Sequence, residues 1–211
     1  TEQWAVATLS GPNAGKILQD AGIDFDLSPA EFPFMSMKEG HIGGLAARIF
    51  RISFTGELSY EINVAARHGL ALWTRLMGAG KAHGITPYGT EAMHVLRAEK
   101  GFIIVGQETD GSVTPYDLGM DWIVSKTKPD FIGKRALARH TMEFADRKQL
   151  VGLLCSDPST VIPEGAHAVL DPNQPLPMKM LGQVTSSYFS PNCGHSIAMA
   201  MLKGGHELKG Q

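Results

Sequence analysis

The fold is decided by Phe54-Thr55-Gly56-Glu57-Leu58-Ser59-Tyr60-Glu61-Ile62, a stretch that combines a tight turn with the start of an apolar run. The turn, Thr55-Gly56-Glu57, joins apolar residues 49–54 to apolar residues 60–64. Turn residues between two such runs are typical of a strand hairpin, or of a strand with a sharp corner. We therefore predict strands over residues 45–54 and 57–64.

Glu61 lies inside the second apolar run, between Tyr60 and Ile62. Because burying an unpaired carboxylate is costly, this side chain must point to water, meet a cation or accept donors from a ligand. A flat heterocycle with adjacent N–H donors suits such an acceptor, with aromatic side chains packed alongside. Spacing alone favours an outward-facing strand residue and leaves the ligand-binding alternative open.

The composition is that of a globular protein. The 211 residues are 43% hydrophobic and 19% charged, which suffices for one large domain or two small domains with a proper core. The formal charge of −2 argues against a nucleic-acid partner. No apolar run reaches the length of a membrane span, and no signal-peptide pattern opens the chain, so we expect no membrane association. We interpret Cys155 and Cys193 as reduced thiols rather than a disulfide, and we expect a cytoplasmic protein.

Further elements are expected on both sides of the hairpin. Residues 4–9 predict a strand, Pro12 to about Asp20 a helix, and 26–44 strand pieces and loop. Leu70, Trp73, Leu76 and Met77 fall on one face of a predicted helix. A second helix is expected from an N-cap at Thr90 to a C-cap at Gly101. After it we expect short strands at 102–105 and 122–125 and a basic helix at 134–140.

The C-terminal part differs in composition. Polar residues 142–149 predict a linker, followed by short strands at 150–155, 166–170, 181–189 and 196–202. Closely spaced strands with turn signals predict a small barrel or sandwich. The expected class is α+β, with a first region of antiparallel sheets and packed helices over residues 1–141 and a β-barrel over residues 150–211.

Few other residues suggest chemistry. Arg97 and Glu99 are two positions apart on the second helix, so they do not face each other. Arg97 has the geometry to clamp a carboxylate, but a surface arginine is the favoured interpretation. The histidines and cysteines lack metal-site spacing, and no glycine-rich phosphate loop follows a strand, so we expect neither a metal nor a dinucleotide site.

Several segments together resemble the folate-binding family of the glycine-cleavage aminomethyltransferase, or T-protein. They keep the family's order along nearly the whole chain: Ser10-Gly11-Pro12, Phe54-Thr55-Gly56-Glu57, Tyr60-Glu61-Ile62, Leu96-Arg97-Ala98-Glu99-Lys100-Gly101, Phe131-Ile132-Gly133-Lys134-Arg135-Ala136-Leu137 and Val184-Thr185-Ser186-Ser187. Within that family, residues 86–99 and 118–122 are similar to the aminomethyltransferase-like region of the alpha subunit of heterotetrameric sarcosine oxidases.

The resemblance implies a tetrahydrofolate site and no catalytic residue within this chain. Glu61 matches the glutamate that holds the pterin, Phe54 and Tyr60 match aromatic positions near its ring, and Arg97 is a candidate for the pocket wall or the glutamate tail. It also implies that the family's assisting aspartate lies upstream of Thr1, in an N-terminal part of the folate domain that this chain lacks.

The implied activity is oxidative one-carbon transfer. A flavin oxidises sarcosine to an imine, and the folate traps its carbon as 5,10-methylenetetrahydrofolate. FAD, FMN and NAD belong to the parent complex and are not expected on this chain alone; its expected partners are folate and the other subunits of a sarcosine oxidase complex. A non-catalytic folate-fold scaffold and a stand-alone aminomethyltransferase remain alternatives.

Overall fold

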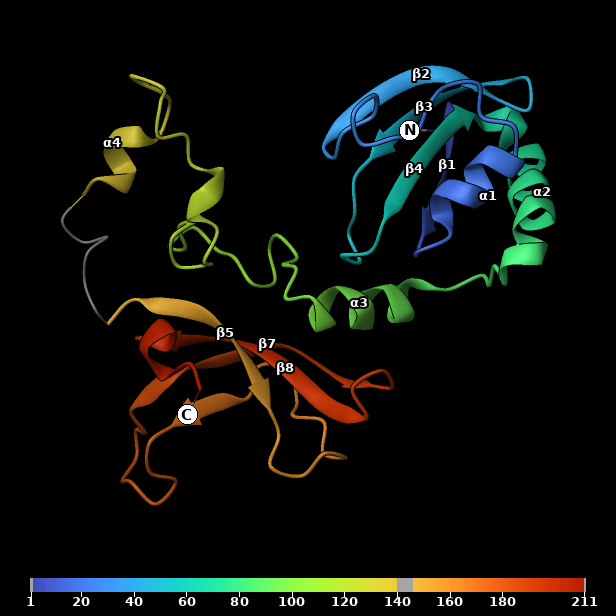
Figure 1. Cartoon of the computed structure of the whole chain (residues 1–211). Coiled ribbons are helices and arrows are strands. Elements are labelled where there is room, and N and C mark those ends of the chain that lie inside the picture. Colours follow the sequence, from blue (N-terminus) through green and yellow to red (C-terminus); the bar gives the residue numbers. More distant parts are fainter. Residues whose placement is uncertain (1, 140–145, 211) are drawn as a thin grey trace. The chain divides into compact units, whose positions relative to one another are not determined.

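The computed structural model describes residues 2–139 and 146–210. They form two compact units, Thr1–Lys100 and Gly101–Gln211, each with its own antiparallel sheet (Figure 1). The expected α+β class, with antiparallel sheets and packed helices followed by a small C-terminal β region, is confirmed. The expected boundaries at residues 141 and 150 stay a prediction.

The first unit is built on a four-stranded sheet with the strand order β1-β4-β3-β2. Its strands are β1 (Trp4–Ser10), β2 (Ser36–Ile42), β3 (Leu45–Arg51) and β4 (Ser59–Ala65). β3 and β4 pair antiparallel across the turn at Thr55-Gly56-Glu57, which confirms the predicted hairpin. Gly56 has φ 78°, a left-handed conformation that glycine adopts without a steric penalty.

Two helices, α1 (Ala14–Asp20) and α2 (Gly69–Gly80), cover one face of this sheet (Figure 1). Side chains alternate between the two faces of a strand, so every second residue of β1, β3 and β4 joins the helices in the core. The core is formed mainly by Leu9, Ile17, Leu18, Phe32, Ile42, Ile49, Tyr60, Ile62, Val64, Leu72 and Leu76. The intervening residues of the strands lie on the opposite face, which we call the outer face.

The buried side of α2 differs from the prediction. Leu72 and Leu76 are buried, whereas Leu70 and Trp73 are 78% and 50% exposed. Apolar residues surround this helix on more than one side, and its packing against β1 and β4 selects a stripe that the spacing alone did not identify.

The third helix, α3 (Thr90–Glu99), occupies the predicted position, but its N-cap is Gly89 rather than Thr90. It ends before Gly101, whose φ of 71° suits the predicted glycine at the helix end. Short 3₁₀ turns flank α2 at Ala66–His68 and Lys81–His83.

The second unit contains a sheet with the order β5-β8-β7-β6. Its strands are β5 (Lys148–Leu154), β6 (His167–Val169), β7 (Met180–Ser190) and β8 (His195–Lys203), and a 3₁₀ turn, Gly205–Leu208, follows. All four predicted strands are confirmed. Within the described residues β5 and β6 are the edges of an open sheet, which packs on a small core of Val151, Val184, Ala198, Ala200 and Leu202.

Residues 101–139 are mostly irregular, and two strand predictions there are wrong. Residues 102–104 have no regular secondary structure, a turn begins at Val105, and Asp121–Ile123 is a 3₁₀ turn. A strand requires a neighbour to pair with, and neither apolar run has one among the described residues. The basic helix is confirmed as α4 (Lys134–Leu137). His140 and residues 142–145 of the predicted linker lie outside the described residues.

Buried polar contacts hold part of this irregular segment to the C-terminal sheet. The Asp117 carboxylate accepts hydrogen bonds from the Thr114 N–H and hydroxyl at 2.8 Å each and from Arg147 Nε at 2.9 Å. The Leu150 N–H of β5 donates to the Asp117 carbonyl at 2.8 Å. The loop 114–117 is therefore fixed beside β5 by a backbone hydrogen bond and by an ion pair whose side chains are 4% (Asp117) and 17% (Arg147) exposed.

Candidate functional site

Glu61 occupies the middle of β4, which is an inner strand of the first sheet. Its neighbours Tyr60 and Ile62 are buried in the core, so the alternation of strand side chains places Glu61 on the outer face. It is half-buried there. Within residues 2–139 and 146–210, no hydrogen bond or ion pair uses its carboxylate. A half-buried carboxylate of this kind has its acceptor capacity available for donors from elsewhere.

Strand pairing places two side chains beside Glu61 on the outer face. Thr8 of β1 lies directly opposite it on one side, and Phe50 of β3 lies directly opposite on the other. Directly opposite residues of antiparallel strands have Cβ atoms about 4.5–5.5 Å apart and project from the same face. Met37 of β2 faces Phe50 and extends this row of side chains to the next strand.

A charged cluster lies two residues along the same face. Arg48 Nε donates to Glu39 Oε1 at 2.8 Å, and the Arg48 guanidinium lies 4.8 Å from the centre of the Trp4 ring. The cation of this face is thus engaged by a carboxylate and an aromatic ring. Arg48 therefore pairs with Glu39 and Trp4 and does not neutralise the charge of Glu61.

Tyr60 is placed on the other side of the sheet from Glu61. It is 2% exposed and stacks on Phe32, with ring centroids 6.1 Å apart and an interplanar angle of 22°. Burial raises the pKa of the Tyr60 phenol, so the side chain is neutral at pH 7. The structure therefore does not bring the Tyr60 ring together with the Glu61 carboxylate, although the two residues are adjacent in sequence.

An ion pair connects the loop that carries Phe54 to the end of the helix that carries Arg97. Phe54 is half-buried in the loop between β3 and β4. Glu57 of the same loop forms an ion pair with Lys100 at 3.3 Å, and Lys100 follows the helix that carries Arg97. Arg97 itself is completely buried, so its interpretation as a surface arginine is wrong. A fully buried guanidinium is rare and marks a position with a specific role in the packing or the site.

A cavity of about 600 Å³ lies along β1, between α1, α2 and residues 83–93. Tyr88 donates from its hydroxyl to Ser10 Oγ at 3.2 Å, and Ser10 Oγ is hydrogen-bonded to Ser59 Oγ. This chain of hydroxyls connects the cavity to the first residue of β4. The sequence offered no signal for it, because the three residues are far apart along the chain.

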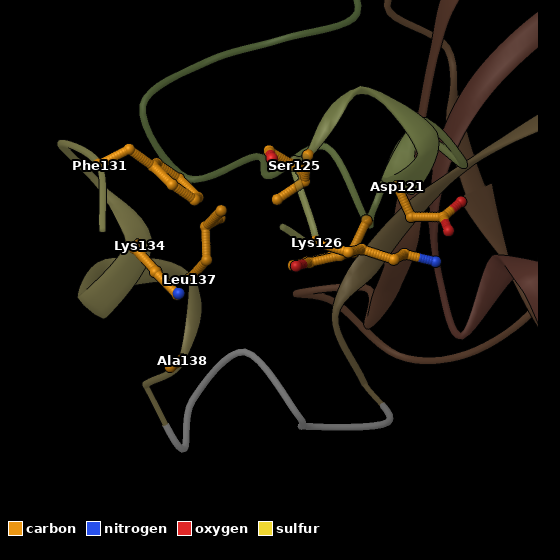
Figure 2. Close-up of a pocket in the computed structure, with 9 residues that line it drawn as sticks. Asp121, Ser125, Lys126, Phe131, Lys134, Leu137 and Ala138 are labelled. Atoms are coloured by element: carbon orange, nitrogen blue, oxygen red, sulfur yellow. The ribbon is translucent and has the colours of Figure 1, made fainter. Parts of the chain in front are cut away.

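A smaller cavity, of about 400 Å³, lies within residues 116–138 of the second unit. Figure 2 shows Phe131 and Leu137 pointing into it, while the charged ends of Asp121 and Lys126 point away. Lys134 Nζ donates to the carbonyls of Lys128 and Pro129 at 3.0 and 2.8 Å, so its charge caps the local loop. None of the predicted site residues lines this cavity.

The described residues contain no group of three or more metal-binding side chains, and both cysteines are free thiols. Among the helices of the described part, none is both long and apolar enough to cross a membrane.

The order of elements and the two antiparallel sheets define a class of protein: an α+β domain of the T-protein type followed by a small β domain. Residues 1–128 match the family described as the GCVT N-terminal domain, and residues 148–211 match the glycine cleavage T-protein C-terminal barrel domain. The chain therefore belongs to the glycine cleavage T-protein family.

Three relatives illustrate the range of this family. The chain is 47% identical to the sarcosine oxidase subunit alpha of Corynebacterium sp. (strain P-1), over 100% of its own length and 22% of that protein. It is 32% identical to the aminomethyltransferase of Halothermothrix orenii (strain H 168 / OCM 544 / DSM 9562), over 96% of this chain and 54% of that one. The crystal structure of glycine cleavage system aminomethyltransferase T from Bartonella henselae matches with a TM-score of 0.76 at 28% identity, covering 96% of this chain and 52% of that chain.

The chain thus spans about a fifth of the length of the sarcosine oxidase subunit and about half that of the aminomethyltransferases.

Proposed function

We propose that this chain is the tetrahydrofolate-binding part of a sarcosine oxidase alpha subunit. In this role it traps the one-carbon unit of oxidised sarcosine as 5,10-methylenetetrahydrofolate. The observation that carries the proposal is the position of Glu61: half-buried on the outer face, with no partner from the described residues for its carboxylate. Similarity to sarcosine oxidase alpha subunits along the whole chain supports it.

The chemistry of Glu61 fits the edge of a reduced pterin. That edge presents an amino group and a ring N–H side by side, and a carboxylate has two oxygens that accept both. Hydrogen bonds to an ionised acceptor are about twice as strong as neutral ones, and partial removal from water strengthens them further. Glu61 would therefore orient the ring as well as hold it.

When bound, reduced folate supplies two nucleophilic nitrogens that take over the methylene carbon of the imine and release glycine. The residues of this chain contribute position. Glu61 fixes one edge of the ring, and we propose that Phe54 contacts it from the hairpin loop. The buried Arg97 supports the pocket wall or the folate tail. Holding a nucleophile close to a reactive carbon turns an encounter in solution into a reaction within one complex.

Titration calorimetry with tetrahydrofolate tests the proposal. We expect Glu61→Gln to weaken binding by about 10- to 100-fold, because it removes charge-assisted hydrogen bonds. Glu39→Gln is the matched control: it removes the same charge from the same face, two strands away, and should change affinity by less than about twofold. Equal binding by wild type and Glu61→Gln would refute the clamp.

The stand-alone aminomethyltransferase is a second candidate, favoured by the match of 96% of the chain to such proteins. Activity distinguishes the two. The first requires a flavoprotein partner that makes the imine from sarcosine, whereas the second transfers an aminomethyl carbon to folate without a flavoprotein. A wild-type chain that binds no tetrahydrofolate would instead indicate a non-catalytic scaffold.

A further inference from the structure

The outer face has an aromatic residue beside Glu61 that is not among the predicted site residues. Phe50 lies directly opposite Glu61 in the register of β3 and β4. Ala47 and Ile49 of β3 are 6% and 0% exposed, so these two side chains point into the core. Because side chains alternate along a strand, Phe50 projects from the outer face, as Glu61 does.

The environment of Phe50 is apolar on one side and acidic on the other. Met37 of β2, which is 47% exposed, faces Phe50 across the β2–β3 pair, and Glu61 faces it across the β3–β4 pair. An apolar ring next to a carboxylate excludes water from one flank of that group. The lower local dielectric strengthens any hydrogen bond that the carboxylate accepts from a ligand.

Tyr60 cannot serve as this ring, because it packs on Phe32 beneath the sheet. Phe54 belongs to the loop beyond the end of β3 and is outside the paired register. Within the paired part of β3 and β4, Phe50 is therefore the aromatic side chain that shares both the face and the row of Glu61.

We propose that Phe50 is the aromatic wall of the pterin subsite, a specificity-determining residue that packs against the ring whose edge Glu61 holds. This inference rests on the proposed function. Phe50 lies on the neighbouring strand, about 4.8 Å away, so a ring that Glu61 holds on the β3 side can pack against it. Phe50 contributes to binding of the pterin and not of the remainder of the folate.

Calorimetric titration of the full chain with two ligands tests this assignment. The first is tetrahydrofolate, and the second is p-aminobenzoylglutamate, which lacks the pterin. We expect Phe50→Leu to weaken tetrahydrofolate binding by about three- to tenfold and to leave the affinity for p-aminobenzoylglutamate unchanged. Phe50→Tyr keeps the ring and should bind tetrahydrofolate within about twofold of wild type.

Phe189→Leu is the matched control, because it removes a partly exposed ring from β7 of the other unit. It should bind both ligands as the wild type does. If Phe50→Leu binds tetrahydrofolate normally while Glu61→Gln does not, the role of Phe50 is refuted and the folate site stands. If Phe50→Leu weakens both ligands equally, the effect is structural and the inference is again overturned.

The result for the wild type distinguishes a failure of the proposed function from a failure of the role assigned to Phe50. Tetrahydrofolate binding that depends on Glu61 supports the proposed function independently of Phe50. Absence of binding by the wild type overturns the function and the role of Phe50 together. Thermal unfolding of each variant verifies its folding, and Phe50→Tyr still tests the requirement for a ring if the leucine variant is unstable.

Discussion

Glu57 and Lys100 form an ion pair, with Nζ 3.3 Å from Oε1, that joins the hairpin loop to the end of α3. The contact brings two separated motifs together: the turn that carries Phe54 and the helix end that carries Arg97. Both side chains are partly exposed, so the pair itself contributes no more than about 1 kcal/mol to folding. The contact mainly fixes the position of the hairpin loop, because the aliphatic part of the Lys100 side chain packs directly over Gly56.

Gly56→Ala should destabilise the first unit by about 2–3 kcal/mol. The residue has φ 78°, and an added Cβ would lie 2.4 Å from Cγ of Lys100, so backbone strain and a steric clash add together. Gly44→Ala is the control, because φ is 85° there and the space beside it is open. It should lose only about 1–2 kcal/mol. Urea denaturation measures the free energy of unfolding of both variants, and equal losses would contradict a clash with Lys100.

Arg97→Ala should destabilise the chain by about 3 kcal/mol or more. The side chain is completely buried, so truncation removes its packing and the interactions of its charge. Arg67→Ala, at an exposed position of the turn after β4, should change stability by less than about 0.5 kcal/mol. Chemical denaturation of the two variants is the measurement. A small loss at Arg97 would show that the surrounding residues repack around the missing side chain.

Asp117→Asn should lower the stability of the second unit by about 3 kcal/mol at pH 7, because it leaves the Arg147 guanidinium beside a neutral group. Asp157→Asn is the control, since its carboxylate is exposed and bonds only to nearby loop residues. It should lose no more than about 1 kcal/mol. Urea denaturation of the two variants measures their free energies of unfolding and distinguishes the two losses.

The same carboxylate predicts a pH dependence. Burial alone would raise the pKa of Asp117, but hydrogen bonds from Arg147 and Thr114 outweigh it and hold the pKa below its usual value. A depressed folded-state pKa contributes stability that is fully present above the unfolded value of about 3.9 and is lost as pH falls through the folded value. Wild-type stability should therefore fall below about pH 4, and Asp117→Asn should show a shallower decline. Parallel declines for the two proteins would rule out Asp117 as the source.

Gly182→Ala should disrupt pairing of β7 with β8 and cost about 3 kcal/mol. An added Cβ would lie 1.8 Å from the carbonyl oxygen of Met201, which is backbone and has no rotamer to move away. Gly152→Ala in β5 meets nothing within 4 Å and should be neutral or slightly stabilising. Thermal melting compares the two strand glycines. A melting temperature that is unchanged in Gly182→Ala would show that β7 shifts to accommodate the methyl group.

Much of the local structure could be predicted because its signals are local. The turn at Thr55-Gly56-Glu57, the glycine after α3 and the alternating strands of the C-terminal region each depend on residues close in sequence. The prediction failed where an apolar run had no partner: residues 102–105 and 122–125 have the composition of strands but no neighbouring strand in the described sheets. It also failed at α2, where spacing alone could not choose between two apolar sides.

The candidate site was predictable in part. The sequence pointed to Glu61, and counting outward from the turn at Thr55-Gly56 pairs residue 61 with residue 50, so the neighbour Phe50 had a usable signal. No such count was available for the hydroxyls of Ser10, Ser59 and Tyr88 or for the burial of Arg97. These depend on contacts between segments that only folding brings together.

The sequence by itself determined the hairpin, the order of the elements and the family motifs, because backbone periodicity and turn chemistry act over a few residues. Tertiary structure decided on which face of the sheet Glu61 lies and which side chains lie beside it. It also decided that Tyr60 and Arg97 are buried. The physical reason is that strand register and helix packing are set by the burial of apolar surface from the whole unit, and a single segment does not contain that information.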